Sequence, residues 1–277
     1  MSSTIGINYM HSKKEILTRN NVTVIGQGSK TLMLAHGFGC DRNMWRFITP
    51  LLIKEYKIVL FDYVGSGKSD LSHYNKDRYS KLEGYAQDIV DICDALNLSN
   101  VSLVGHSVSS IIGILASIQS PTLFTKLIMV CPSPCFLNFA PNYFGGFDKE
   151  DLDELLNIMD KNYIGWADYL APLVMGSNQS KDLIDELSSS FCSTDPVIAK
   201  SFAKATFFSD YRHILKDVTH ECLIFQSNND ALAAPRIGEF MHQEITHSTL
   251  QVIDAQGHCL HMTVPEDIAI RIAEYVK

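Results

Sequence analysis

The sequence has no apolar run as long as the roughly 18 residues of a membrane-spanning helix, so no span is expected. It also has little positive charge: 23 lysines and arginines stand against 31 acidic residues, for a net charge of −8. Nucleic acids and anionic membrane surfaces both require a basic patch, so neither is an expected partner. Residues 1–14 are polar and lack the apolar block of a secretory signal, and we interpret them as a tail.

Paired cysteine spacings are missing too. The seven cysteines are scattered and odd in number, which is typical of reduced, mostly buried thiols, and we therefore expect a cytoplasmic protein. Neither Cys131-x3-Cys135 nor His258-Cys259-x-His261 has the spacing of a structural zinc site. The two Gly-x-Gly stretches, at 37–39 and 65–67, do not continue as a dinucleotide-binding motif. The sequence therefore predicts no metal and no cofactor.

What the sequence does contain is an alternation of apolar strands and amphipathic helices. A chain of 277 residues that is 46% hydrophobic fits one large α/β domain. The alternation predicts a mostly parallel sheet covered on both faces, after an N-terminal hairpin. Eight strands are expected, at 16–19, 22–25, 31–35, 57–61, 101–104, 126–130, 222–226 and 249–253. Helices are expected at 41–52, with Asp41 as N-cap, and at 82–96, 108–120, 236–244 and 265–276.

The alternation stops between residues 132 and 208. Four helical patterns follow one another there without a strand, and the fourth opens at Asp195-Pro196, an N-cap followed by proline. We predict a helical insertion that divides an α/β core into residues 1–131 and 209–277. Ligands of α/β sheets bind beyond the carboxyl ends of the strands, so an insertion at this position is interpreted as a lid, although it could be a plain helical subdomain.

The stretch from Val101 to Ser109 organises the rest of the chain. A short strand meets a helix abruptly, with Ser107 at the turn and Gly105 two residues before it. Such a turn strains its central residue, requires small neighbours and places the hydroxyl at a helix N-terminus. Ser109 stands where the motif G-x-S-x-G has its last glycine. On this pentapeptide alone, Ser107 is either a nucleophile or a turn residue or helix N-cap.

Two later residues favour the nucleophile. Asp230 lies at the end of one predicted strand and His258 just past the next, and the order Ser, Asp, His is that of the α/β-hydrolase triad. Histidine can take the serine proton and return it to a leaving group, and a buried carboxylate fixes the imidazole tautomer. We therefore predict Ser107 as nucleophile, His258 as base and Asp230 as acid. His261 is a rival base and Asp254 a rival acid.

The loop after the strand at 31–35 is the second half of the predicted site. The backbone N–H groups of Phe38 and Val108 are expected to form the oxyanion hole, because Val108 follows the nucleophile and Phe38 lies in this loop. Gly37 and Gly39 let the loop approach closely. His106, beside the nucleophile, is expected to pack behind the turn.

Six longer motifs give the chain a specific resemblance. It resembles the RsbQ-like hydrolases, which are bacterial energy-stress regulators related to the plant strigolactone and karrikin receptors, over nearly all of the chain from about Ile16. Ser109 looks like the plant members, where the bacterial pattern has glycine. The motifs are His36-Gly37-Phe38-Gly39-Cys40-Asp41, Phe61-Asp62-Tyr63-Val64-Gly65-Ser66-Gly67, Gly105-His106-Ser107-Val108, Tyr143-Phe144-Gly145-Gly146-Phe147, Asn162-Tyr163-Ile164-Gly165-Trp166 and Phe191-Cys192-Ser193-Thr194-Asp195-Pro196.

The resemblance implies an α/β-hydrolase fold with a mostly parallel eight-stranded sheet and a four-helix lid. It implies slow hydrolysis of a small hydrophobic ester or lactone-like ligand in an apolar pocket. By position, this pocket would be lined by Phe38, Phe147, Trp166 and Phe207. In the bacterial members the protein activates a partner phosphatase in the stress response, so a regulatory phosphatase is an expected partner. A metabolic carboxylesterase without a partner is the alternative, and a binding module with a vestigial triad is a third.

Overall fold

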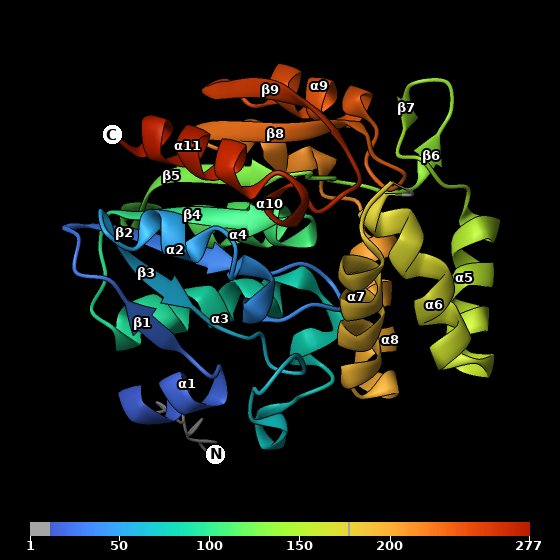
Figure 1. Ribbon diagram of the computed structural model, residues 1–277, viewed down its shortest axis with the longest axis horizontal. Helices are drawn as coiled ribbons and strands as arrows, with labels where there is room; N and C mark the ends of the chain where they lie inside the picture. Colours follow the sequence, from blue (N-terminus) through green and yellow to red (C-terminus); the bar gives the residue numbers. More distant parts are fainter. Residues whose placement is uncertain (1–11, 177) are drawn as a thin grey trace, which may run out of the picture.

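The computed structural model describes residues 12–176 and 178–277, and its centre is a twisted sheet (Figure 1). Seven strands run in the order β1-β3-β2-β4-β5-β8-β9. Only β1 pairs antiparallel, and the other pairs in this sheet are parallel. The strands are β1 (Thr23–Ile25), β2 (Lys30–Ala35), β3 (Tyr56–Leu60), β4 (Val101–His106), β5 (Phe124–Val130), β8 (Glu221–Asn229) and β9 (Ser248–Gln256).

Helices cover both faces of this sheet. In β2, Leu32 and Leu34 pack into the hydrophobic cluster on one face, and Met33 packs into the cluster on the other. A strand buried on both faces is apolar throughout, as expected for a parallel sheet. The first cluster lies under α2 (Thr49–Leu52), α10 (Leu260–Thr263) and α11 (Pro265–Val276), and the second under α3 (Leu82–Ala95), α4 (Val108–Gln119) and α9 (Pro235–Glu244). The fold predicted from the alternation is confirmed.

The N-terminal hairpin was a wrong prediction. Residues 16–19 lie in α1 (Lys13–Arg19), so the main sheet has seven strands in the described part of the chain instead of eight. Ser12 and Glu15 form a capping box, which satisfies two backbone donors at the helix start. The predicted tail is also wrong at residues 12–14, which form the cap and first turn of this helix, while residues 1–11 lie outside the described part.

Two smaller elements also differ from the prediction. The helix expected at 41–52 is a 3₁₀ helix at Arg42–Trp45, capped by the side chain of Asp41, followed by the separate helix α2. A two-stranded ladder, β6 (Asn138–Phe139) with β7 (Tyr143–Phe144), was not predicted. Further 3₁₀ helices lie at Leu71–His73, Arg78–Ser80, Pro121–Leu123 and Arg212–Asp217.

Four consecutive helices stand beyond the carboxyl ends of the strands (Figure 1). They are α5 (Lys149–Lys161), α6 (Tyr163–Met175), α7 (Lys181–Ser193) and α8 (Pro196–Phe207), at the positions that the sequence predicts. Within residues 12–176 and 178–277, no helix combines the length and the apolarity needed to cross a membrane.

Candidate active site

Ser107 occupies the tight turn between β4 and α4. Its backbone has φ 55° and ψ −123°, in the region that non-glycine residues rarely adopt. A Cβ at Gly105 would lie 2.5 Å from the carbonyl oxygen of Ser109, so this neighbour must be glycine. The turn therefore presents the Ser107 hydroxyl at the N-terminus of α4, where the first N–H groups have no partner within the helix.

Ser109 is fully buried and hydrogen-bonded on both sides. Its hydroxyl donates to the carbonyl oxygen of His36, and the Tyr63 hydroxyl lies 3.0 Å from it. Since the Ser109 proton points to His36, the Tyr63 hydroxyl is the donor in the second bond. A serine at this position therefore ties the turn to two neighbouring loops, which a glycine could not do.

His258 contacts Ser107, and Asp230 contacts His258. The Nε2 atom of His258 lies 2.7 Å from the Ser107 Oγ atom, and its Nδ1 atom lies 2.7 Å from Asp230 Oδ2. The other carboxylate oxygen of Asp230 accepts from the backbone N–H groups of Leu232 (2.8 Å) and Ala233 (3.1 Å). Because an ionised carboxylate only accepts, Nδ1 donates to Asp230 and Nε2 is left to accept the serine proton.

The parallel sheet brings these three side chains together. Asp230 is the first residue after β8, and His258 is the second residue after β9. Both strands are parallel neighbours in the half of the sheet that begins at β4, so their ends meet at one edge. The carboxyl ends of these strands therefore hold Ser107, His258 and Asp230 in one hydrogen-bonded row.

The two rival residues lie elsewhere. The exposed Asp254 accepts from the side chain of Asn228 at 2.6 Å. His261 is fully buried against Trp45, and neither of its ring nitrogens has a hydrogen-bond partner within the described residues. Burial, then the neighbouring His258 and Arg46, lowers the pKa of His261 to about 3. Neither residue is placed to serve Ser107.

Histidines also support the site from behind. His106 is buried, its Nε2 atom lies 2.9 Å from the His258 carbonyl oxygen, and burial holds its pKa well below the ordinary value. His36 accepts from the Tyr63 backbone N–H through Nε2, so its Nδ1 atom donates to the Gly37 carbonyl oxygen. Burial lowers the pKa of His36 as well, and the neutral ring fixes the start of the loop that carries Phe38. The sequence singled out His106 but gave no signal for this function of His36.

The loop at residues 37–39 packs too closely for side chains at either glycine. A Cβ at Gly37 would lie 2.4 Å from His106 Nδ1, and one at Gly39 would lie 2.1 Å from the Phe191 ring. Gly39 also has φ 70°, which favours glycine. Ser190 of α7 donates a hydrogen bond to the Gly39 carbonyl oxygen at 2.8 Å. The loop is thus held between β4 and α7, with Phe38 next to Ser107 in the lining of one cavity.

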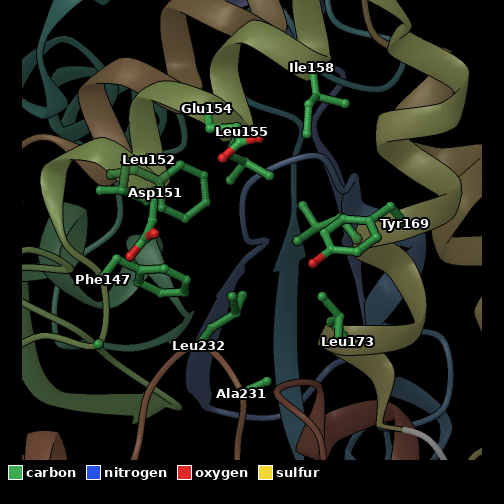
Figure 2. Close-up of a pocket in the computed structure, with 13 residues that line it drawn as sticks. Phe147, Asp151, Leu152, Glu154, Leu155, Ile158, Tyr169, Leu173, Ala231 and Leu232 are labelled. Atoms are coloured by element: carbon green, nitrogen blue, oxygen red, sulfur yellow. The ribbon is translucent and has the colours of Figure 1, made fainter.

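Three of the four predicted pocket residues line two neighbouring cavities, and Trp166 lines neither. The inner cavity contains Ser107 and His258, has a volume of about 20 Å³, and is lined by Phe38 and Phe207 among others. A larger outer groove of about 610 Å³ lies between α5 and α6 and is lined by Phe147 and Phe207 (Figure 2). Trp166 lies behind these surfaces, with its ring centre 6.1 Å from that of Phe38.

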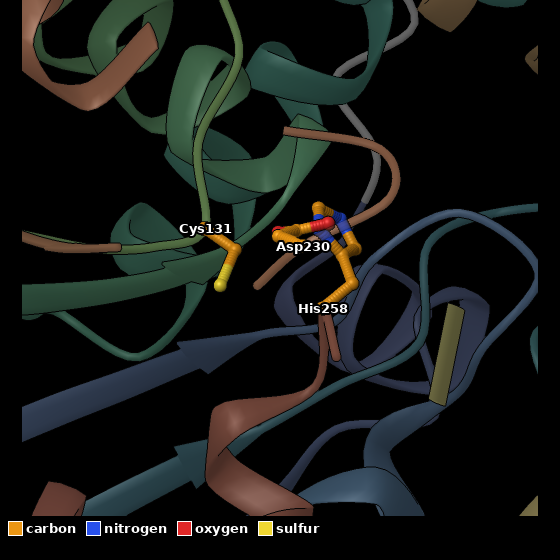
Figure 3. A group of neighbouring side chains, drawn as sticks. All are labelled: Cys131, Asp230 and His258. Carbon is orange, nitrogen blue, oxygen red and sulfur yellow. The ribbon is translucent and has the colours of Figure 1, made fainter. Parts of the chain in front are cut away.

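Cys131 lies beside Asp230 and His258, a position that its spacing to Cys135 in the sequence does not predict. It is fully buried at the end of β5, and it offers one possible metal ligand within 4.8 Å of those of Asp230 and His258 (Figure 3). Burial and the Asp230 charge raise the pKa of the Cys131 thiol well above its usual value. The thiol is therefore protonated, and the Nδ1 atom of His258 carries a proton, so neither is in the form that binds a metal.

Comparisons with known proteins agree with this geometry. The family model described as the alpha/beta hydrolase fold matches residues 30–265. The karrikin insensitive 2 receptor IA of Petunia hybrida is 40% identical over 93% of this chain and 93% of the relative. The strigolactone esterase RMS3 of Pisum sativum is 36% identical over 92% and 95%. The solved structure of a hydrolase from Oleispira antarctica is 55% identical, covers 96% of this chain and 97% of its own, and has a TM-score of 0.95.

Proposed function

This chain belongs to the α/β-hydrolase family, and from that premise we propose that it is a serine hydrolase that cleaves small hydrophobic esters or lactones at Ser107. The observation that carries the proposal is the unbroken chain of hydrogen bonds from Ser107 through His258 to Asp230. Relatives named as esterases and a similar structure titled as a hydrolase support the reaction class.

In the proposed first step, the Ser107 Oγ atom attacks the ester carbonyl carbon while His258 Nε2 takes the hydroxyl proton. The bond to the alcohol then breaks, and His258 gives that proton to the leaving oxygen. Asp230 stabilises the positive imidazolium between these two transfers without taking its proton. The product alcohol leaves, and the acyl group stays on Ser107.

The second step repeats the chemistry with water. His258 takes a proton from a water molecule, whose oxygen attacks the acyl carbon, and the proton then returns to Ser107 as the carboxylic acid is released. In both steps the carbonyl oxygen gains negative charge. We propose that the backbone N–H groups of Val108 and Phe38 donate to it, because these residues flank Ser107 at the start of α4 and in the loop held by Ser190.

The lining of the inner cavity supports an apolar substrate. Apart from the catalytic group and its neighbouring Cys, His and Thr side chains, that lining consists of aliphatic and aromatic residues, Phe38 and Leu170 among them. No lysine or arginine is among the described residues that line it, so a phosphate or carboxylate would find no charged partner there. We propose that α5 to α8 act as the lid of this site, as predicted for residues 132–208.

A short p-nitrophenyl ester and a serine-directed phosphonate test the proposal together. The purified protein should hydrolyse the ester, and the phosphonate should label Ser107. Labelling that persists in the Ser107→Ala variant, or a complete lack of turnover in the wild type, would refute the proposal.

A second candidate function is ligand-dependent signalling, as in the RsbQ-like branch. It is favoured by the receptor names of relatives that are about 40% identical over most of the chain. Under this proposal, an acyl group or bound ligand on Ser107 alters α5 to α8, and a partner such as a phosphatase binds their outer surface. A pull-down with and without ligand distinguishes it from metabolic esterase activity. Some substitutions on the outer surface of these helices, such as those of Asp153, Lys161 or Lys181, should then abolish partner binding and leave ester hydrolysis intact. Recovery of no partner favours the metabolic enzyme.

A further inference from the structure

The inner cavity and the outer groove are separated by a wall of three apolar side chains. Leu170 of α6, Phe207 of α8 and Leu232 of the loop after Asp230 are the residues that line both spaces. Leu170 and Phe207 are buried and Leu232 is half-buried. The wall is therefore one side chain thick, and it stands between Ser107 and the outer groove.

The inner cavity alone is too small for a substrate. Its volume of about 20 Å³ has room for roughly one water molecule, whereas pockets that bury a small ligand measure about 300–1,000 Å³. The outer groove, at about 610 Å³, lies within that range. A substrate whose carbonyl group reaches Ser107 must therefore place most of its atoms outside the inner cavity, and the groove beyond the wall is the adjacent space.

The charged residues that line the outer groove are all acidic. Its floor and sides are mainly apolar, but Asp151 and Glu154 of α5 line it, and no basic residue is among the described residues that do so. Figure 2 shows both carboxylates on the side of Phe147 and Leu152, with the Tyr169 hydroxyl directed into the groove from the opposite side. One carboxylate oxygen of Asp151 accepts from the backbone of Asp148 as part of the α5 cap. The carboxylates of Asp151 and Glu154 therefore repel an anion in the groove and attract a cation or a hydrogen-bond donor.

We infer that the outer groove binds the distal part of the acyl chain of the substrate, that Asp151 and Glu154 select against a carboxylate at its end, and that the three-residue wall limits which chains pass. This inference rests on the proposed hydrolase function and names the specificity of the same site. The preferred substrate is a medium-chain ester with a neutral or cationic end. The wall opens when the side chains of α6 and of the Leu232 loop move apart. The acyl chain of the substrate then passes between them from the inner cavity into the outer groove.

Charge selection is tested with two p-nitrophenyl esters of equal acyl length, one ending in a trimethylammonium group and one in a carboxylate. At 0.15 M salt the wild type should prefer the first severalfold in kcat/KM, as expected for two exposed charges close to a ligand. The double variant Asp151→Asn, Glu154→Gln should lower that ratio toward one, and asparagine keeps the acceptor of the helix cap.

The matched control is the double variant Glu150→Gln, Asp153→Asn. It removes two charges from the same helix, at exposed positions outside the groove lining, and it should keep the wild-type ratio. Since both double variants have the same net charge, a ratio that falls equally in both would attribute the preference to the overall charge of the protein and overturn this inference.

The wall is tested with acetyl and octanoyl p-nitrophenyl esters. Leu232→Ala should raise the octanoyl-to-acetyl ratio of kcat/KM severalfold, and its backbone bond to Asp230 remains. Leu170→Ala is the second variant, and Ile164→Ala, at an exposed position on the same helix, is the control. If both wall variants still hydrolyse the acetyl ester and their octanoyl-to-acetyl ratio of kcat/KM equals that of the wild type, the inference is overturned. If the wild type hydrolyses neither ester, the proposed function itself is refuted.

Discussion

The α/β core and the four helices α5 to α8 stabilise themselves in different ways. The core contains a buried charged cluster: Asp88 is fully buried and forms ion pairs with Arg19 and Arg78. In the four helices the ion pairs lie at the surface, as between Lys149 and Asp153, and the buried positions of α5 to α7 are all apolar. Buried charges fix geometry, because leaving either partner unpaired is costly.

The difference in stabilising contacts suits the two regions to different functions: the core positions the reacting groups, and the helices select the substrate. Directional hydrogen bonds in the core hold the reacting groups at fixed distances, which acyl transfer requires. The four helices contact the core mainly through apolar side chains, whose contacts have no direction, and through a few hydrogen bonds, such as those from Ser190 to Gly39 and from the His258 backbone N–H to Val174. We therefore expect these helices to adjust to a ligand more readily than the strands do. The chemistry is therefore expected to respond sharply to substitutions in the core, and substrate choice to respond to substitutions in the helices.

The largest expected effect tests the core half of this comparison. His258→Ala should lower kcat by about 10⁶-fold, because no other side chain takes the Ser107 proton. His261→Ala, three residues away, should keep most of its turnover. The measurement is steady-state hydrolysis of a short ester after circular dichroism has established folding. A dead His261→Ala variant that is folded would contradict the assignment of the base.

Asp230→Asn should lower kcat by about 10⁴-fold without unfolding the protein. The amide oxygen can still accept from Leu232 and Ala233, which leaves the amide N–H₂ facing His258. The ring must then accept at Nδ1 and carry its proton on Nε2, where it cannot take the proton of Ser107. Asp254→Asn is the matched control at the rival acid, and equal losses in both variants would contradict the triad.

Acidification is expected to weaken the core through His261. Its folded pKa of about 3 lies below the ordinary value of 6.5, so only the unfolded state gains this proton as the pH falls from about 6.5 toward 3. The free energy of unfolding should lose about 1.4 kcal/mol from this residue between pH 7.5 and 5.5. Urea titrations of the wild type and of His261→Met measure it. Parallel curves for the two proteins over this range would show the prediction to be wrong.

The smallest expected effect lies where the two regions meet. Ser190→Ala removes the hydrogen bond from α7 to the Gly39 carbonyl oxygen and should lower kcat about fivefold, a loss of about 1 kcal/mol. Ser189→Ala, at the exposed neighbouring position, should leave kcat unchanged. If Ser190→Ala approached the effect of Asp230→Asn, the division of tasks between core and helices would not hold.

The fold and the three residues of the candidate site could be predicted from the sequence, because a parallel sheet brings the residues that follow its strands to the same edge. Once Ser107, Asp230 and His258 are each located after a strand, the fold brings them to one edge, so spacing along the chain suffices. The failed hairpin at 16–19 has a local cause: the apolar and β-branched residues of that stretch favour a strand, but the capping box at Ser12 and Glu15 starts a helix. Ser12, the first residue of that signal, lay within the residues that were interpreted as a tail.

Other features depend on packing that sequence patterns do not specify. Cys131 reaches Asp230 because β5 and β8 are neighbours in the sheet, and nothing in its surroundings along the chain signals this. The helical periods of α5 and α6 predict two amphipathic helices but not the groove between them, which depends on how far apart they pack. Trp166 carries the same apolar pattern whether it lines a cavity or lies behind Phe38.

The hydrogen bond between Ser107 and His258 joins residues 151 positions apart. A ribosome that adds about 5–20 residues per second needs about 8–30 s to make that stretch. During that time the nascent chain contains the serine and the residues of its turn but no base to activate it. The growing protein is therefore chemically inert toward esters until its last strand has been made, and only then does it become an enzyme.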